Sequence, residues 1–326
     1  MEINNETIEL VGYGHADRFS DYLGELILEK NLEQDPNAKV ALEVLATGKT
    51  ISLGGEITSD ANIDYEELVY FAIEKIYGEK WWPNFRQNVK IYNHIVEQSI
   101  ELKEIQNEDQ EIKAGDQGVI YGFYDKERFE KIKKLYKLME KVRENFDIAP
   151  DWKLLYNEKE ISMSVCGKVN HSSIKKFIEK ELNNKKTNVI INPKGEWLIA
   201  GPLGDTGVIG RKLMIDTFGA GIPHGGGAFC GKDLSKVDKT GILWATKIAK
   251  KYSIANKINT VIVELNFKIG DNHPKIFINN EEIEISKLNL INLSLDQFIK
   301  TENLINEKWS KHVIKGSSVL SWLEEL

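Results

Sequence analysis

The chain has 326 residues with a hydrophobic fraction of 41%, a charged fraction of 29% and a formal net charge of -7, an ordinary composition for a folded globular protein that weighs against binding to nucleic acids or anionic membranes. The two cysteines, Cys166 and Cys230, lie far apart in the sequence, so they favour neither a disulfide framework nor a zinc site and indicate a reducing compartment. Neither a signal peptide nor an apolar run long enough to span a membrane is evident, and we therefore expect a cytoplasmic protein.

The first third of the chain alternates between helical and strand-like patterns. Apolar residues recur at helical spacing over residues 16–34, and an Asp-Pro pair ends this helix. Residues 39–57 form two alternating runs around a turn at Gly48, which predicts a β-hairpin. A second helix is predicted over residues 64–77, and Gly78 ends it.

The same strand–strand–helix order recurs twice further along the chain. Residues 152–169 predict a hairpin, and residues 172–184 predict a helix capped by serine. A third round comprises a strand over residues 260–270 and a helix near residues 295–309. We therefore predict an α+β fold of three structurally related strand–strand–helix layers with pseudo-threefold repetition, in which helices cover one face of each sheet.

Two polar segments interrupt this pattern. Residues 125–146 are the most charged part of the chain and predict a long helix whose lysines form a solvated face rather than a binding patch. Residues 97–118 lack an apolar stripe and predict a mobile loop, and loops of this length in compact domains are often lids. We place the three predicted domains at residues 1–105, 111–197 and 198–326.

Glycine-rich stretches mark the places where chemistry is expected. The stretch PHGGGAFCGKD, residues 223–233, has the G-x-x-x-x-G-K spacing of a Walker A loop up to Lys232, but Asp233 stands where that loop needs Ser or Thr to hold magnesium. Four more stretches are GHADRFSD, LGGEIT, KAGDQG and GPLGDTGVIGRK. Taken singly, such glycines more often mark turns or bulges, and a lone His15 or Asp17 at a helix start is more often a cap than a catalyst.

Together these stretches supply the side chains of a nucleotide triphosphate site. Glycine-rich backbone can bring several N–H groups close to an anion, and His15 can share a proton or stabilise charge. Carboxylates suited to hard cations accompany cationic groups suited to phosphate oxygens. These carboxylates and cations are Asp17, Glu43, Asp238, Lys153, Arg211, Lys212, Lys232 and Lys236. The sequence therefore indicates a site for magnesium and a nucleotide triphosphate.

At these positions the sequence resembles the methionine adenosyltransferase family, also called S-adenosylmethionine synthetases. HGGGAFCGKDLSKVD resembles the family's C-terminal signature and KAGDQGVIYGFY its central signature, while GHADRFSD, LEQDPNAKVALEV, LGGEIT, INPKGEWLIAGPLGDTGVIGRK and MIDTFG fall in the family order. The resemblance implies that the methionine sulfur attacks C5′ of ATP and that the released tripolyphosphate is hydrolysed to diphosphate and phosphate. It also implies that residues 223–233 are not a Walker A loop and that the magnesium ligand lies further on, at Asp238.

The resemblance assigns a role to each candidate residue. The catalytic residues would be His15, Lys153, Arg211, Lys212 and Lys232. ATP would be bound by His15, Asp151, Lys153, Trp197, Asp205, Arg211, Lys212, Ala228 and Lys232. Methionine would be bound by Glu56, Gln98, Asp116, Asp205 and Lys236. Mg2+ would be bound by Asp17 and Asp238, and K+ by Glu43. The polar loop after Gln98 would be the family's gating loop.

The resemblance also implies a homodimer with shared active sites, while assembly into a tetramer stays open. The sequence departs from the family pattern where Arg18 replaces a lysine and where Glu196-Trp197 replaces an Arg-Phe pair, and it lacks the insertion after YGFY and the aromatic, glycine-rich ending. Because the catalytic set is retained, we predict an active enzyme. Two alternatives stay open: a degenerate relative that binds ATP or methionine and regulates a partner, and an enzyme of the same chemistry acting on a different thioether or nucleotide.

Overall fold

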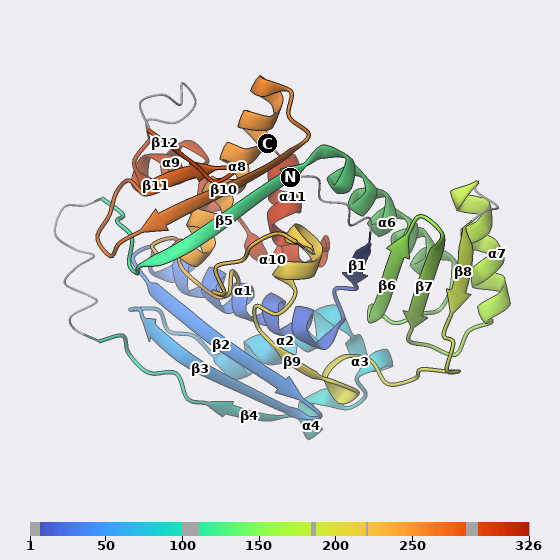
Figure 1. Cartoon of the computed structure of the whole chain (residues 1–326). Helices are drawn as coiled ribbons and strands as arrows, with labels where there is room; N and C mark the ends of the chain where they lie inside the picture. Colours follow the sequence, from blue (N-terminus) through green and yellow to red (C-terminus); the bar gives the residue numbers. More distant parts are fainter. Residues whose placement is uncertain (1–6, 100–110, 184–186, 220, 285–292, 326) are drawn as a thin grey trace.

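The computed structural model describes residues 7–99, 111–183, 187–219, 221–284 and 293–325, and Figure 1 shows their arrangement. Three four-stranded sheets form the framework, and helices pack against each of them. This arrangement matches the predicted α+β fold of three related layers. Within these residues, no helix combines the length and the apolar character needed to cross a membrane.

The first sheet, in the order β4-β3-β2-β9, is built around the predicted hairpin. Its strands are β2 (Lys39–Thr47), β3 (Thr50–Thr58), β4 (Lys90–Asn93) and β9 (Thr206–Val208). β2 and β3 pair antiparallel from Lys39 opposite Thr58 to Thr47 opposite Thr50, and Gly48 turns the chain with φ +54°. β9 joins the other edge of β2 from far downstream, a pairing that local periodicity does not predict.

Two predicted helices accompany this sheet. α1 (Ala16–Gln34) packs against β2 and β9, and α2 (Tyr65–Ile76) packs against α1. As predicted, α1 ends at the Asp35-Pro36 pair, and Gly78 with its positive φ follows α2. The short helices of this region are α3 (Gly78–Trp81) and α4 (Phe85–Asn88). The predicted gating loop falls mainly on residues 100–110, which lie outside the described residues.

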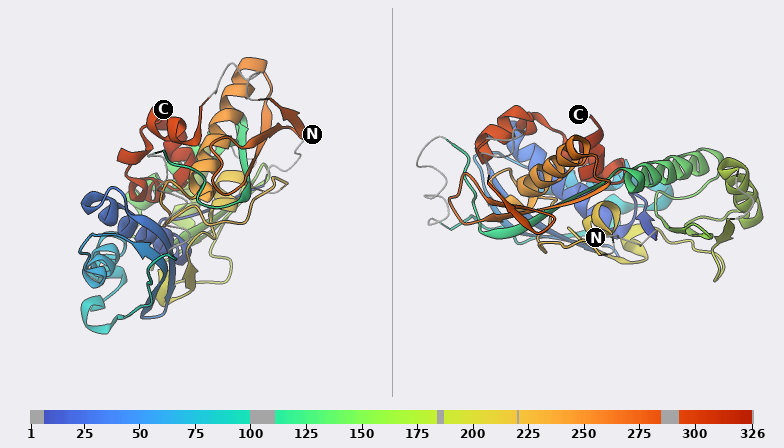
Figure 2. Two further views of the ribbon diagram at one scale, coloured as in Figure 1. Left: turned by 90° about the vertical axis from the view of Figure 1, so that its left-hand side faces the viewer. Right: turned by 45° about the horizontal axis from the view of Figure 1, so that its top comes forward.

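The second sheet, in the order β1-β6-β7-β8, extends to one side of the molecule with α6 (Lys126–Asn145) and α7 (His171–Leu182), as Figure 2 shows. Its strands are β1 (Ile8–Val11), β6 (Trp152–Asn157), β7 (Glu160–Val165) and β8 (Asn188–Ile191). The hairpin of β6 and β7 and the long charged helix were predicted correctly. The serine cap was wrong, because the Asn170 side chain accepts the N–H of Ser173 at 3.0 Å and begins α7.

The third sheet, in the order β12-β11-β10-β5, is covered by α8 (Val237–Asn256), which packs against β5 and β10. Its strands are β5 (Gly118–Asp125), β10 (Thr260–Phe267), β11 (Lys275–Ile278) and β12 (Glu281–Ile283). The predicted strand over 260–270 is confirmed. The helix predicted near 295–309 is wrong in length, because Asn303 adopts φ 53° and separates α9 from η4.

Short elements complete the chain. They are η1 (Gly201–Leu203), η2 (Met214–Phe218), α9 (Leu295–Thr301), η4 (Leu304–Asn306), α10 (Trp309–Ile314) and α11 (Ser318–Glu325). α10 packs against the side of α1, so α1 lies between the first sheet and the C-terminal helices. The predicted domain boundaries stay a prediction. The sheets do not follow these boundaries strictly, because β1, β5 and β9 each pair with a strand from a distant part of the chain.

Candidate functional site

The first cluster of candidate residues lies at the N-terminus of α1, where His15 is the N-cap. Its Nδ1 atom accepts the backbone N–H of Asp17 at 3.1 Å, and its side chain is buried. The interpretation of His15 as a helix cap is therefore confirmed. Because Nδ1 is the acceptor, the neutral ring carries its proton on Nε2, which has no hydrogen-bond partner among the described residues. The cap thus leaves one N–H group of the ring for a ligand.

The surroundings of His15 favour its neutral form. Burial, together with the positive charges of Lys212 and Lys153, lowers the pKa of the imidazole to about 3. The carboxylates of Asp17 and Asp205 act in the opposite direction but do not prevail. At neutral pH this imidazole can therefore donate one N–H to an anion without carrying a charge itself.

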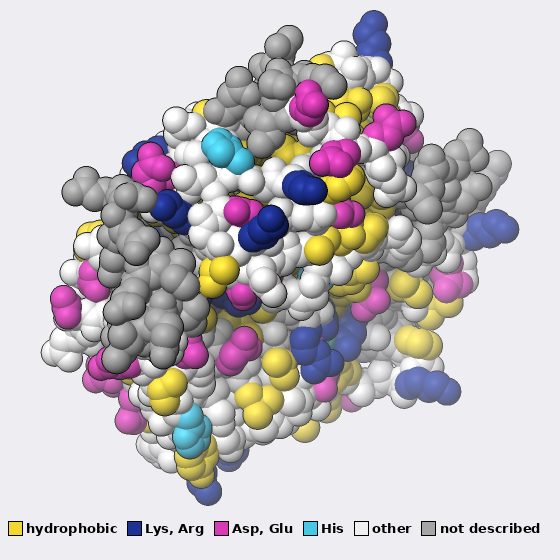
Figure 3. All heavy atoms as spheres, turned by 60° about the vertical axis from the view of Figure 1, so that its left-hand side comes forward, with side chains coloured by type: hydrophobic (Ala, Val, Ile, Leu, Met, Phe, Trp, Pro, Cys, Tyr) yellow, Lys and Arg dark blue, Asp and Glu magenta, His cyan; other side chains and the backbone are white. Residues whose placement is uncertain are grey.

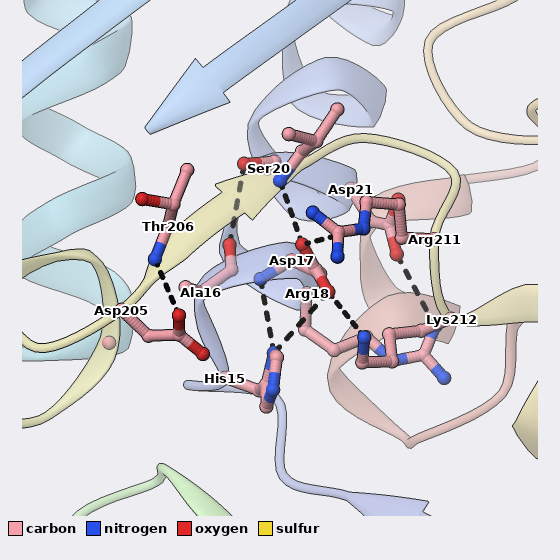
Figure 4. A network of polar contacts seen from close by, with 12 residues as sticks. His15, Ala16, Asp17, Arg18, Ser20, Asp21, Asp205, Thr206, Arg211 and Lys212 are labelled. Carbon is pink, nitrogen blue, oxygen red and sulfur yellow. Dashed lines mark hydrogen bonds and ion pairs between the residues drawn. The ribbon is translucent and has the colours of Figure 1, made fainter. Parts of the chain in front are cut away.

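Asp17 connects the first turn of α1 to the loop that follows β9 (Figure 4). Its Oδ1 accepts the N–H of Val208 at 2.8 Å, and its Oδ2 forms an ion pair with Lys212. Arg211 is exposed, and its Nε lies 3.8 Å from Oδ1. Burial raises the pKa of Asp17, but the hydrogen bonds from Lys212 and Val208 outweigh burial and leave that pKa below its usual value. Two predicted ATP cations thus lie at one predicted magnesium ligand.

The wall next to His15 comes from β6 and the chain around η1. Asp151 is buried, and its Oδ2 accepts the N–H of Gly201 at 2.6 Å, while its Oδ1 has no hydrogen-bond partner among the described residues. Burial raises the pKa of Asp151 to about 7. Lys153 and Asp205 are exposed, and both lie close enough to shift the pKa values of His15 and Asp151. These predicted ATP residues therefore belong to the same cluster.

Trp197 and Ala228 are the remaining predicted nucleotide contacts. The Trp197 indole is half-buried and donates its Nε1–H to the carbonyl of Ile199 at 2.8 Å, and the neighbouring Glu196 is exposed. Ala228 packs against Gly210, which lies in the loop after β9. A Cβ atom added to Gly210 would come within 2.4 Å of the Cβ atom of Ala228. Only glycine fits at position 210 without moving its neighbours, so the contact brings two glycine-rich stretches together.

The loop over residues 223–233 is held at its end by Asp233. Its Oδ2 accepts the N–H of Val40, and its Oδ1 accepts both the N–H and the Oγ–H of Ser235, at distances of 2.6 to 2.9 Å. Gly226 and Gly231 adopt positive φ values of 94° and 74°. A carboxylate whose two oxygens are occupied in this way holds the loop onto β2, and it does not replace the magnesium-binding Ser or Thr of a Walker A loop.

The second cluster lies where this loop meets the first turn of α8. Lys232 donates to Oδ2 of Asp238 at 2.5 Å, and both side chains are partly buried. Asp238 faces Gly227, where a Cβ atom would come within 2.0 Å of its Oδ1. Lys236 is the N-cap residue of α8. Glu43 projects from the exposed face of β2. Desolvation raises the pKa of its carboxyl, and the nearby positive charge of Lys232 only partly offsets this rise. The structure thus groups Lys232, Lys236, Asp238 and Glu43.

Three of the residues predicted to bind methionine, Glu56, Gln98 and Asp116, make contacts outside the cluster around His15. Glu56 lies on β3 and forms a bridge with Val96. Gln98 is buried, its N–H donates to Oγ1 of Thr58 at 3.1 Å, and its Oε1 has no hydrogen-bond partner among the described residues. Asp116 is exposed, and its Oδ1 accepts the N–H of the next residue at 2.7 Å. These contacts place Glu56 and Gln98 at the end of the first sheet, apart from the ion pairs of Asp17.

The carboxylates fit a magnesium ion that arrives with a nucleotide. Among the residues that the structure describes, no three His, Cys, Asp or Glu side chains are grouped so that they could hold a metal ion by themselves. Mg2+ is usually held by one or two carboxylates together with substrate phosphates and water. Asp17 and Asp238 supply hard oxygen donors of this kind, and each one pairs with a lysine in the protein alone.

Sequence reasoning missed three buried charges behind these clusters. Asp21 accepts a hydrogen bond from the N–H of Gly210 at 2.7 Å, and Glu25 accepts one from Lys239 Nζ at 2.6 Å. The signal that could have revealed them is the spacing of Asp17, Asp21 and Glu25. Residues four apart share one face of a helix, so this face of α1 had to be either solvated or paired.

Comparison with family models identifies two regions of the chain. Residues 5–100 match the model described as S-adenosylmethionine synthetase, N-terminal domain, and residues 199–316 match the model of the C-terminal domain. The curated relatives include an S-adenosylmethionine synthase of Mycoplasma capricolum subsp. capricolum, 32% identical over 97% of this chain and 93% of the relative. They also include an S-adenosylmethionine synthase of Mesoplasma florum, 34% identical over 83% of this chain and 81% of the relative.

Comparison with solved structures supports the same architecture. An unusual S-adenosylmethionine synthetase from Campylobacter jejuni superposes with a TM-score of 0.81, covering 97% of this chain and 95% of that chain. The sequences are 22% identical, so this likeness bears on the fold. The predicted α+β fold of three related layers is confirmed.

Proposed function

The chain belongs to the S-adenosylmethionine synthetase family, and we propose that the residues around His15 are the place where it joins ATP and L-methionine into S-adenosylmethionine. The predicted enzyme class, methionine adenosyltransferase, is confirmed by the same comparisons. The observation that supports the location is the buried, neutral His15, whose Nε2 lacks a protein partner among the described residues while Lys153 and Lys212 lie nearby. An N–H donor beside two cations suits a departing triphosphate.

The chemistry asks the protein mainly for positioning and charge. The methionine sulfur forms a bond to C5′ of ATP, the C5′–O bond breaks, and the electron pair leaves on the triphosphate oxygen. His15 would donate its Nε2–H to that oxygen, while Lys153, Arg211 and Lys212 would offset the charge along the chain of phosphates. The released tripolyphosphate is then hydrolysed to diphosphate and phosphate.

The remaining nucleotide and methionine contacts follow from the same arrangement. Asp151 and Asp205 border the His15 cluster, Ala228 packs on Gly210 directly before Arg211, and the Trp197 indole offers a flat surface for the adenine. Lys232 would bind phosphate oxygens. The methionine ammonium and carboxylate would be bound by Glu56, Gln98, Asp116, Asp205 and Lys236.

Asp17 and Asp238 would hold Mg2+, which neutralises part of the triphosphate charge when it is bound, and Glu43 would hold K+. In the protein alone these two aspartates pair with Lys212 and Lys232. Each lysine therefore keeps its aspartate charge-balanced before ATP arrives. The same lysines are the ones that we assign to phosphate oxygens, so an exchange of partners would couple the aspartates to nucleotide binding.

We place the active site between two copies of the chain, in a cytoplasmic homodimer. Large apolar side chains are exposed on strands of all three sheets, namely Leu45 on β2, Tyr92 on β4, Val119 on β5 and Leu155 on β6. Figure 3 shows hydrophobic side chains exposed among charges of both signs on one face of the molecule. A two-fold interface over such surfaces would bring Glu56 and Gln98 of one copy to the nucleotide residues of the other. Two buried cysteine thiols suit a reducing compartment.

The decisive experiment is a product assay on the purified protein. With ATP, methionine, magnesium and potassium, we expect S-adenosylmethionine, diphosphate and phosphate in equal amounts. Measurable ATP binding without any product would instead favour a regulatory relative. Product from a methionine analogue alone would favour an enzyme for a different thioether.

A further inference from the structure

A fully buried ion pair connects the two helices that carry the candidate magnesium ligands. Lys239 Nζ on α8 donates a hydrogen bond to Oε2 of Glu25 on α1 at 2.6 Å, and both side chains have an exposed fraction of 0%. α1 carries Asp17 in its first turn, and α8 carries Asp238 in its first turn. The pair therefore connects the first turn of α8 to α1 at a point two turns beyond Asp17.

The surroundings of Lys239 restrict its position on every side. Its Nζ lies 5.3 Å from the ring centre of Phe229 and 5.1 Å from that of Trp309, so two aromatic faces contact the charge that Glu25 balances. Cys230 also lies beside Glu25. A buried ion pair is weak evidence for stability, because desolvation of two charges offsets most of their attraction. What such a pair can contribute instead is specificity, because it favours one relative orientation of the two helices that carry it.

The geometry in question is the rotation of α8. Successive residues of an α-helix point about 100° apart, because a turn contains 3.6 residues. When Lys239 is held toward α1, the direction of the preceding Asp238 toward Gly227 and Lys232 is therefore determined as well. The carbonyl of Lys236, the N-cap of α8, accepts the N–H of Lys239 at 3.1 Å, so the backbone of Lys236 is tied to the same turn.

Asp21, one turn before Glu25 on the same face of α1, connects this helix to the loop after β9. Its Oδ1 accepts the N–H of Gly210, directly before Arg211 and Lys212, and its Oδ2 lies 3.6 Å from Nη1 of Arg18. One buried face of α1 thus contacts both of the cation-bearing segments, the loop after β9 and the start of α8.

We propose that Glu25 and Lys239 are positioning residues that set the rotation of the first turn of α8 and thereby place Asp238 and Lys236 for the reaction. This inference rests on the proposed function for the roles of Asp238 and Lys236. It does not rest on the proposed function for the connection between the two helices, which the ion pair makes directly.

The test replaces both partners, so that no lone charge is buried. Glu25→Gln with Lys239→Met keeps the side-chain volumes and removes the pair. The matched control is Glu302→Gln with Lys247→Met, which removes another largely buried pair from the same helix, where Lys247 also lies 5.9 Å from a ring, that of Trp322. We expect both double variants to melt within a few degrees of each other.

The two double variants should differ in function and in local protection. Because a displacement of about 1 Å at a reacting group can cost about 100-fold, we expect a 10- to 100-fold loss of kcat in the Glu25/Lys239 variant and little change in KM for ATP. It should also need more Mg2+ for half-maximal rate, and the amides of residues 236–240 should exchange hydrogen faster. Glu25→Asp with Lys239→Arg, which keeps the charges and the combined length, should restore kcat to within a few-fold.

The inference is overturned if the Glu25/Lys239 variant equals the control in kcat, in Mg2+ dependence and in amide exchange. Should the double variant fail to fold, Glu25→Gln alone is measured in the same way. A failure of the proposed function would look different: the unaltered protein would make no S-adenosylmethionine, while the exchange measurement would still report whether the pair orders the start of α8.

Discussion

Two carboxylate–lysine pairs on one face of α1 have opposite surroundings. Asp17 pairs with Lys212 at the N-terminal end of the helix, where the lysine retains an exposed fraction of 14% and Arg211 next to it is exposed. Glu25 pairs with Lys239 two turns further on, and both side chains are fully buried. The first pair can exchange partners with a ligand, while the second is enclosed by protein. The comparison teaches that packing decides whether a carboxylate–lysine pair on one helix keeps contact with solvent or is sealed off from it.

The largest expected difference between the two pairs is in the free energy of unfolding that is lost when each lysine is removed. Lys239→Met leaves the Glu25 carboxylate buried without a partner, so we expect a loss of about 3–5 kcal/mol in the free energy of unfolding. The matched change Lys212→Met leaves the buried Asp17 carboxylate with the Val208 N–H and with the exposed Arg211 close by, so we expect a smaller loss of about 1–2 kcal/mol. Denaturant unfolding measures both values, and equal losses would contradict the distinction.

The next effect is on turnover. Asp17→Asn and Asp238→Asn each remove a hard anionic oxygen from a site that must offset the charge of a triphosphate, so we expect each to lower kcat by at least about 100-fold. The measurement is the steady-state rate at saturating magnesium. Near-normal turnover in either variant would mean that the ion is bound elsewhere.

A third measurement concerns Asp151, a buried carboxyl near the same cluster. Burial raises its pKa in the folded protein to about 7, against about 3.8 in an unfolded chain, so folding favours the protonated form. Its contribution to stability is therefore present at low pH and is lost as the pH rises from about 4 to 7.

The neutral variant Asp151→Asn should lack this dependence. Between pH 5 and pH 7 we expect the wild type to lose about 2–3 kcal/mol relative to the variant, which follows from about 1.4 kcal/mol per pH unit. Thermal or denaturant unfolding at the two pH values checks the result. Parallel pH profiles for the two proteins would show that Asp151 is already ionised at pH 5.

The smallest predicted effect is the partial return of activity in a mixed dimer, and it tests whether each active site is shared between two copies of the chain. Glu56→Ala and Lys212→Ala should each inactivate the homodimer, but a mixed dimer would carry both lesions in one site and leave the other intact. Refolding an equal mixture gives about half mixed dimers, so roughly a quarter of the wild-type activity should return. If mass measurement confirms mixed dimers and no activity returns, the two residues serve the same site or the two sites are coupled.

Local patterns in the sequence predicted α1, α2, α6, α7, the two central hairpins and β10, but not α8 or the strands β1, β4, β8 and β9. The hairpin around Gly48, α1 and α6 follow from alternation, helical periodicity and turn residues, each of which acts over a few positions. The cap of α7 was misassigned because Asn170 and Ser172 lie two positions apart near its start and have similar capping propensities, so the backbone geometry decides between them.

The site was predictable only as a set of residue types. Glycine-rich stretches with acids and cations indicated a phosphate site, and the likeness to a known family assigned the roles. That Asp17 lies against Lys212, and that Asp233 holds its loop onto β2, depends on contacts between residues almost two hundred positions apart. Residue type alone does not distinguish a carboxylate that holds a loop from one that awaits a ligand.

The sequence by itself therefore determined the strongly periodic helices and hairpins, the glycine turns and the inventory of charged groups, because these depend on neighbours along the chain. The tertiary structure decided which strand joins which sheet and which charge meets which partner. β1, β5 and β9 each pair with distant strands, and Glu25 and Lys239 meet only when α1 and α8 have packed. The physical reason is that burial and desolvation, which make such a pair matter, are properties of the folded protein and have no local signature in the chain.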